Sequence, residues 1–141
     1  MAIMARNRTT ILAALLCQAA ALFAAHPAFA VACDTSKAPV VPVIRGLPYA
    51  QARTAILASG WQPVVGHPHN DMASNEATFR DRGYTELQFC RLTDTSPCRL
   101  MFSAGTIALW IVTEGDENAM LGTQAVVKSA KLACVGEPDP S

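Results

Sequence analysis

The cysteines constrain the fold of this chain more than any other feature of its sequence. Five are present, and the first, Cys17, lies in an N-terminal segment that reads as an export signal. The other four form an even set in a compartment that oxidises thiols, which predicts two disulfides. Four cysteines allow three pairings. We favour Cys90 with Cys98, which flank a short turn-like segment, and Cys33 with Cys134, which bracket the domain. The sequence alone does not determine this connectivity.

The export signal occupies residues 1–30. Arg6 and Arg8 supply its positive start, residues 9–23 form an uncharged and mostly apolar run, and residues 28–30 offer the small residues that a signal peptidase requires. We therefore expect the functional chain to begin near Val31 and to be periplasmic or secreted. Lipidation of Cys33 is the alternative, because residues 30–33 loosely match the tetrapeptide that precedes the lipidated cysteine of bacterial lipoproteins.

The charge that remains after cleavage excludes one class of partner. The whole chain has 11 basic and 11 acidic side chains, and loss of Arg6 and Arg8 leaves a net charge of about −2. Nucleic-acid binding needs a clustered excess of Lys and Arg, which this sequence lacks. No later segment is apolar enough to predict a membrane span after cleavage. About 111 residues remain, which is enough for one domain.

Local patterns predict an α+β domain. Residues 31–45 contain Pro39 and Pro42 and are expected to be extended, whereas residues 48–59 have helical spacing and end at Gly60. A short edge strand follows at 61–66, then a short polar helix at 75–82. Residues 84–90, 98–103 and 106–113 predict strands, with a tight reversal at 104–105. Residues 124–134 are ambiguous between strand and helix, and we prefer a final strand. We thus expect one main helix on a small, mostly antiparallel sheet of three to five strands, a single domain over 46–135, and a flexible tail at 136–141.

Two short stretches resemble parts of a PASTA repeat, an extracytoplasmic module of some cell-wall kinases and penicillin-binding proteins. Residues 41–61 match its spacing of Pro, Gly, Ala and aliphatic positions, and residues 109–115 look like its final strand. The resemblance implies a helix packed on a three-stranded sheet. The wider pattern, a helix, Gly-Trp-x-Pro and two cysteines around a hairpin, also looks like small secreted bacterial proteins with no assigned activity.

Few residues in the sequence are candidates for a metal-binding or ligand-binding site. His67, His69 and Asp71 lie in one short loop and are candidate ligands for zinc, copper or nickel, although a polar turn is the simpler interpretation. Trp61 and Tyr49 are a possible ligand surface, although burial of Trp61 in the core is the simpler interpretation. We expect the charged residues of two segments, 80–82 and 114–117, to be solvated.

No residue set predicts a catalytic site, since the cysteines are expected in disulfides and no serine has a recognisable nucleophile setting. The sequence therefore predicts an exported, non-catalytic binding module without a cofactor. Its partner would be an envelope or extracellular protein, which the module could inhibit, or peptidoglycan. The alternative is a periplasmic metal-binding protein that uses the His67/His69 loop, with zinc or copper as its metal.

Overall fold

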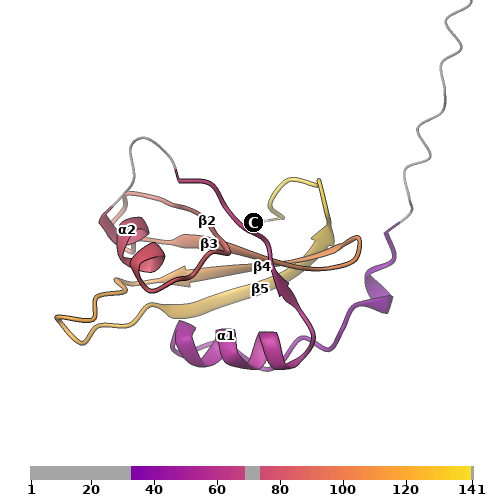
Figure 1. Cartoon of the computed structure of the whole chain (residues 1–141), viewed down its shortest axis with the longest axis horizontal. Helices are drawn as coiled ribbons and strands as arrows, with labels where there is room; N and C mark the ends of the chain where they lie inside the picture. Colours follow the sequence, from indigo (N-terminus) through magenta and orange to yellow (C-terminus); the bar gives the residue numbers. More distant parts are fainter. Residues whose placement is uncertain (1–32, 69–73, 141) are drawn as a thin grey trace, which may run out of the picture. The chain divides into compact units, whose positions relative to one another are not determined.

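The computed structural model describes residues 33–68 and 74–140 (Figure 1). The predicted export signal lies outside the described residues, as do His69 and Asp71. Within this part of the chain a short 3₁₀ helix, two α-helices and five strands follow one another. In order they are η1 (Thr35–Lys37), α1 (Tyr49–Ala58), β1 (Gln62–Pro63), α2 (Ser74–Asp81), β2 (Leu87–Cys90), β3 (Cys98–Ala104), β4 (Ile107–Glu114) and β5 (Val126–Cys134).

The strands form one antiparallel sheet in the order β1-β3-β4-β5, and β2 also pairs with β3. β4 is central, as predicted, and Gly105 makes the reversal between β3 and β4 with a φ of 60°. β1 and β2 share the outer edge of β3. The amide of Val64 donates to the carbonyl of Met101, whose own amide donates to the carbonyl of Glu86. Each of these two short strands therefore covers only part of the edge.

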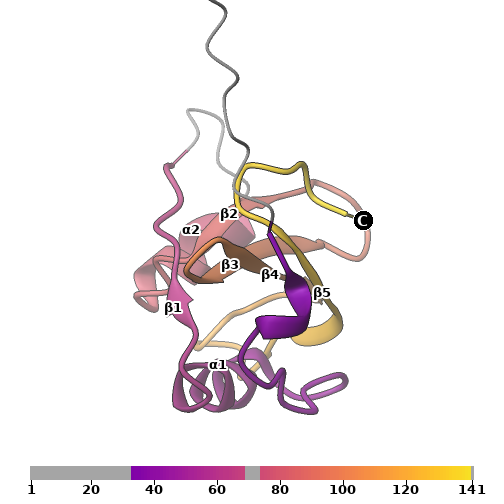
Figure 2. The ribbon, with the colours of Figure 1, turned by 90° about the vertical axis from the view of Figure 1, so that its right-hand side faces the viewer.

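α1 forms where the sequence predicts a helix. Pro48 caps its N-terminus, and Gly60 follows its end with a φ of 92° that suits glycine. Its buried stripe consists of Tyr49, Ala52 and Ile56, and these side chains join the core. Figures 1 and 2 show α1 lying across one face of the sheet, next to β4 and β5.

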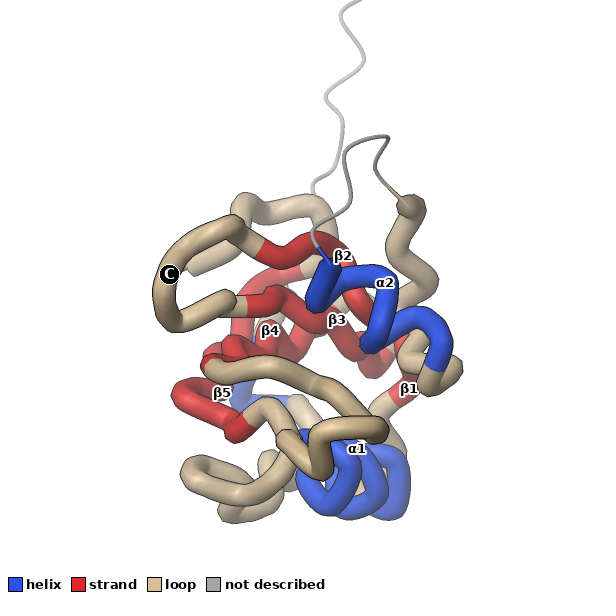
Figure 3. The backbone as a smooth tube through the Cα atoms, turned by 90° about the vertical axis from the view of Figure 1, so that its left-hand side faces the viewer, coloured by secondary structure: helices blue, strands red, loops and turns tan. Residues whose placement is uncertain are grey.

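The expectation of one main helix is not confirmed, because α2 also contributes to the core. Its Phe79 is fully buried, with its ring centroid 5.7 Å from that of Tyr49 and 5.8 Å from that of Tyr84. Figure 3 shows α2 beside β2 and β3. The α+β class and the antiparallel sheet agree with the sequence, whereas the core of this small domain draws on two helices.

Both favoured disulfides are present. Cys90 and Cys98 face each other across β2 and β3, and Cys33 is joined to Cys134 at the end of β5. The second bridge spans 101 residues and ties the N-terminal segment to the last strand. None of the helices that the structure describes is long and apolar enough to cross a membrane.

The C-terminal segment, for which the sequence predicts a flexible tail, makes two polar contacts with the sheet. Residues 136–140 turn back over the face of the sheet opposite α1, where the segment is drawn in yellow in Figure 1. Asp139 pairs with Arg99 of β3 at 2.5 Å, and Lys131 of β5 donates to the carbonyl of Pro140 at 2.9 Å. One ion pair and one hydrogen bond thus hold a segment that has no periodic pattern of its own.

Candidate functional site

The predicted ligand surface at Trp61 and Tyr49 is wrong, because both side chains are fully buried. The hydroxyl of Tyr49 donates a hydrogen bond to the carboxylate of Glu86, which is also fully buried. Burial first and the Glu86 carboxylate second raise the pKa of Tyr49 above its ordinary value. Trp61 packs in the core, with its indole nitrogen 3.4 Å from the carbonyl of Val40. Both aromatic rings therefore stabilise the fold and are closed to a ligand.

Of the three predicted metal ligands, the structure describes His67, which is exposed and whose carbonyl accepts a hydrogen bond from Arg80. Within residues 33–68 and 74–140, no three His, Cys, Asp or Glu side chains are grouped closely enough to hold a metal ion. Since His69 and Asp71 lie outside the described residues, this metal site stays a prediction.

A largely buried ion pair connects α1 to the segment that leads into β2. Arg53 of α1 donates to both carboxylate oxygens of Glu86, at 2.6 and 3.3 Å, and its guanidinium lies 5.5 Å from the centre of the Tyr84 ring. The hydrogen bond to Glu86 is the main cause of the raised pKa of Arg53. Burying a carboxylate without such partners is energetically costly. These residues therefore fix α1 against the segment that leads into β2.

Arg80 has a similar structural role and departs from the expectation that residues 80–82 are solvated, whereas Asp81 and Arg82 are exposed. The Arg80 guanidinium pairs with Glu76 at 3.1 Å and donates to the carbonyls of Gly66, His67 and Leu87. Its side chain is consequently only 17% exposed. Arg80 thus holds the segment after β1 against the start of β2.

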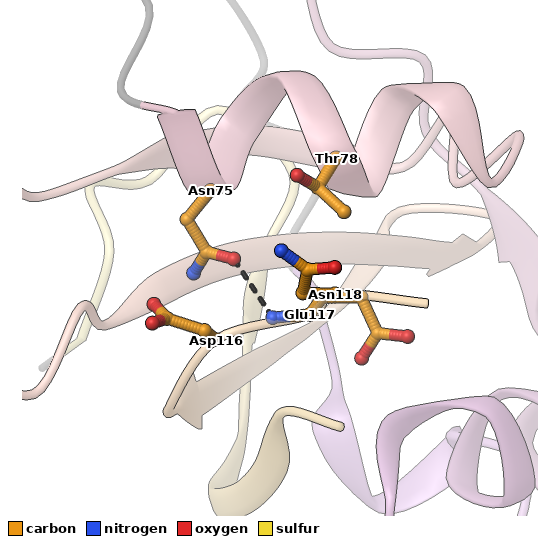
Figure 4. A pocket seen from close by; sticks show the side chains of 5 residues that line it. All are labelled: Asn75, Thr78, Asp116, Glu117 and Asn118. Carbon is orange, nitrogen blue, oxygen red and sulfur yellow. Dashed lines mark hydrogen bonds between the residues drawn. The ribbon is translucent and has the colours of Figure 1, made fainter. Parts of the chain in front are cut away.

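A groove lies between α2 and the loop that follows β4, and we call it the α2 groove (Figure 4). Its inner part has a volume of about 90 Å³. A wider hollow of about 300 Å³ shares Thr78 and Asn118 with this inner part and continues towards Met120. The residues that line the inner part are Asn75 and Thr78 of α2 and Asp116, Glu117 and Asn118 of the loop.

Asn75 joins the two sides of the α2 groove. Its side-chain carbonyl accepts from the amide of Glu117 at 2.9 Å, as the dashed line in Figure 4 shows. Its side-chain NH₂ group lies within 3.3 Å of the carbonyls of Ser96 and Gly115 and of the Cys98 sulfur. One nearly buried amide therefore sets the position of the loop after β4 relative to α2 and to the Cys90–Cys98 disulfide.

Glu117 is the second anchor of this loop, and its burial contradicts the expectation that it is solvated, whereas Asp116 is exposed as expected. Only 1% of the surface of Glu117 is exposed. One carboxylate oxygen accepts from the amide of Ala125 at 2.9 Å, and the other lies 3.3 Å from a guanidinium nitrogen of Arg82. Burial, followed by the charge of Glu117, raises the pKa of Tyr84. Both ends of the 118–123 loop are thus fixed by one buried carboxylate.

The 118–123 loop presents two large apolar side chains to solvent. Met120 is 93% exposed and Leu121 is 75% exposed. The side-chain oxygen of Asn118 accepts from the amides of both residues, at 3.0 and 3.2 Å. Asn118 and Thr123 also exchange two backbone hydrogen bonds at the base of the loop. The loop is therefore held in one conformation while its apolar tip stays outside the core.

Sequence reasoning missed Asn75, Asn118 and the exposed pair at the loop tip. A signal was available for Asn118, because Asn118 and Gly122, two residue types that favour turns, enclose three residues and indicate a tight loop. Its apolar residues could then have been assigned to the tip of that loop. Asn75 had no comparable signal, since its partners are up to 42 residues away.

No known protein family, curated protein or solved structure matches the chain. The likeness of residues 41–61 and 109–115 to a PASTA repeat therefore stays a prediction. The fold and the site themselves define an α+β domain that is closed by two disulfides and carries an ordered, apolar loop tip beside a polar groove.

Proposed function

We propose that this chain is an exported, non-catalytic binding module whose partner is an envelope or extracellular protein. Its two disulfides support an exported location, because such bonds persist in oxidising compartments. All four cysteines of the described chain are used in these bonds, so the described residues contain no thiol available as a nucleophile. Binding is the activity that a rigid small domain without a recognised reaction centre supports best.

The observation that carries this proposal is the tip of the 118–123 loop. Leaving Met120 and Leu121 in water forgoes the free energy of burying them, which is about 2 kcal/mol for each side chain. A protein surface recovers this free energy when it covers the tip. Because Asn118 already holds the loop, little conformational entropy is lost on binding. Methionine also adapts readily to the shape of an apolar pocket.

The surroundings of the tip fit the usual anatomy of a protein interface, in which a polar rim encloses an apolar centre. Asp81 and Arg82 of the wider hollow lie with Met120 along the same groove. Asp116 is exposed at its inner part. A partner that places an apolar pocket over the loop tip would meet both signs of charge at its edge.

A site-specific crosslinking experiment tests the proposal. A photo-crosslinking amino acid replaces Leu121 in the exported protein, and Leu92 provides the matched control because it is also apolar and 81% exposed. We expect a discrete protein adduct from position 121 and none from position 92. The same adduct partner, identified by mass spectrometry, should bind purified protein, and Leu121→Ser should weaken that binding at least tenfold.

Equal labelling at both positions, or no adduct at either, would argue against this loop as the recognition element. The cell-wall alternative is separated by a second measurement, retention of the purified protein on peptidoglycan sacculi. Retention that is unaffected by Leu121→Ser would favour peptidoglycan over a protein partner.

The metal-binding alternative rests on the sequence alone, and the His67→Ala/His69→Ala double variant tests it by native mass spectrometry with added zinc.

A further inference from the structure

The face of the sheet opposite α1 carries a tryptophan between two basic residues. Met101 of β3, Trp110 of β4 and Lys131 of β5 are direct cross-strand partners, so their side chains lie on the same face. Arg99 precedes Met101 by two residues on β3 and therefore also points to this face. We call Arg99, Trp110 and Lys131 the tail site.

The chain's own C-terminal segment occupies the tail site. Asp139 pairs with Arg99 at 2.5 Å, and these two side chains are 18% and 12% exposed. The next residue, Pro140, accepts a hydrogen bond from Lys131 through its carbonyl at 2.9 Å. Because Arg99 and Lys131 belong to the strands on either side of β4, residues 139–140 must pass above β4, where Trp110 lies. Figure 2 shows this yellow segment on the side of the sheet away from α1.

The C-terminal segment leaves one hydrogen-bond donor of the tail site without an acceptor. The indole nitrogen of Trp110 is shielded from solvent, and no acceptor for its proton is found among the residues that the structure describes. A shielded donor normally has a partner in a folded protein. An occupant with an oxygen at this point would therefore bind better than the chain's own tail does.

We propose that the tail site binds an extended, carboxylate-bearing polypeptide segment of a partner protein, and that residues 136–140 occupy it in cis until the partner displaces them. Arg99 would pair with the carboxylate, and Lys131 would donate to a backbone carbonyl. The Trp110 indole would donate to a second carbonyl. The proposal does not rest on the α2 groove, with which the tail site shares no residue.

The composition of the tail supports this assignment. Pro138 and Pro140 favour an extended backbone and lack amide donors, so the segment offers acceptors to a site that consists of donors. As a covalently attached competitor it acts at a high local concentration, commonly in the millimolar range. A partner segment must therefore bind more tightly than the tail. Acidic peptides of low affinity should not bind to the tail site of the intact protein.

The test uses the full mature chain with Asp139→Lys, which places a repelling charge opposite Arg99 and Lys131. Asp94→Lys is the matched control, because it makes the same change of charge at an exposed loop position. The Trp110 indole signal in ¹⁵N-labelled protein reports whether the tail site is covered, and Trp61, buried in the core, is the internal reference. We expect Asp139→Lys to shift the Trp110 signal and to speed its hydrogen exchange at least tenfold, with Asp94→Lys unchanged.

Peptides then probe the opened site. We expect the Asp139→Lys protein to bind a peptide of residues 135–141 and also the unrelated peptide Pro-Glu-Pro-Glu-Pro, at least tenfold more tightly than the unmodified protein binds either. Adding Lys131→Gln should weaken both complexes. An unchanged Trp110 signal in Asp139→Lys would show that the tail does not cover the site. Binding of neither peptide, or of the chain's own sequence alone, would overturn the proposal of a partner segment.

Discussion

The disulfides provide the sharpest test of how this small domain is stabilised. The two bridges close loops of different length, with sequence separations of 101 residues for Cys33–Cys134 and 8 for Cys90–Cys98. In the chain-entropy model, removing the long closure lowers the free energy of unfolding by about 4.7 kcal/mol, and removing the short one by about 2.5 kcal/mol. We therefore expect the double variant Cys33→Ala/Cys134→Ala to be the less stable of the two.

Side-chain burial in the structure reduces the expected difference in stability between the two double variants. Cys98 is fully buried and its sulfur lies 3.3 Å from the side-chain nitrogen of Asn75. Truncation to alanine removes this packing and adds about 1 kcal/mol to the effect of Cys90→Ala/Cys98→Ala. Cys33 and Cys134 are only partly buried, so their truncation adds less. The expected losses thus become about 4.7 and 3.5 kcal/mol, which keeps their order.

Urea unfolding of the mature chain, followed by circular dichroism, measures both losses. For a domain of this size the free energy of unfolding falls by about 1 kcal/mol or slightly more per molar urea. The two double variants should therefore differ in midpoint by about 1 M, with the Cys33/Cys134 variant lower. Equal midpoints, or a lower midpoint for the Cys90/Cys98 variant, would refute the argument from loop length. Such a result would mean that attaching residues 33–45 to β5 contributes little to the free energy of unfolding.

Three further predictions concern individual contacts. Gly66→Ala should lower the free energy of unfolding by about 3 kcal/mol, because an added Cβ would overlap the carbonyl of Leu87; an unchanged thermal unfolding curve would contradict this. The raised pKa of Tyr49 keeps its phenol neutral in the folded protein after the unfolded chain ionises near its ordinary value of 10.0, so stability should fall as the pH rises above 10; Tyr49→Phe should flatten this loss in denaturant titrations between pH 8 and 11. Asn118→Ala should cost about 1 kcal/mol and speed hydrogen exchange of the two amides at the loop tip, whereas unchanged exchange would show that the backbone alone holds the loop.

Several parts of the fold could be predicted because their signals are local. The alternation of apolar residues marks β3, and the near-continuous apolar run marks β4 as a central strand. Gly60, Gly83 and Gly105 end or reverse elements where a positive φ is required. The even cysteine count after the predicted signal indicated two disulfides, and the structure contains the favoured pairing.

The α2 groove and the tail site could not be predicted, because they depend on partners that are far apart in sequence. Asn75 binds residues of the loop after β4, and Asp139 of the C-terminal segment pairs with Arg99. A charged residue looks the same in sequence whether it is solvated or paired. Glu117 was therefore assigned to the surface although it is 1% exposed.

The sequence by itself determined which segments become helices, strands and turns, since periodicity, caps and glycine positions act over a few residues. Only the tertiary structure decided which face each element buries and which charges meet. It placed Trp61 and Tyr49 in the core and left Met120 and Leu121 in solvent. The physical reason is that burial and ion pairing depend on distances in space, and packing of the two helices and the sheet sets those distances.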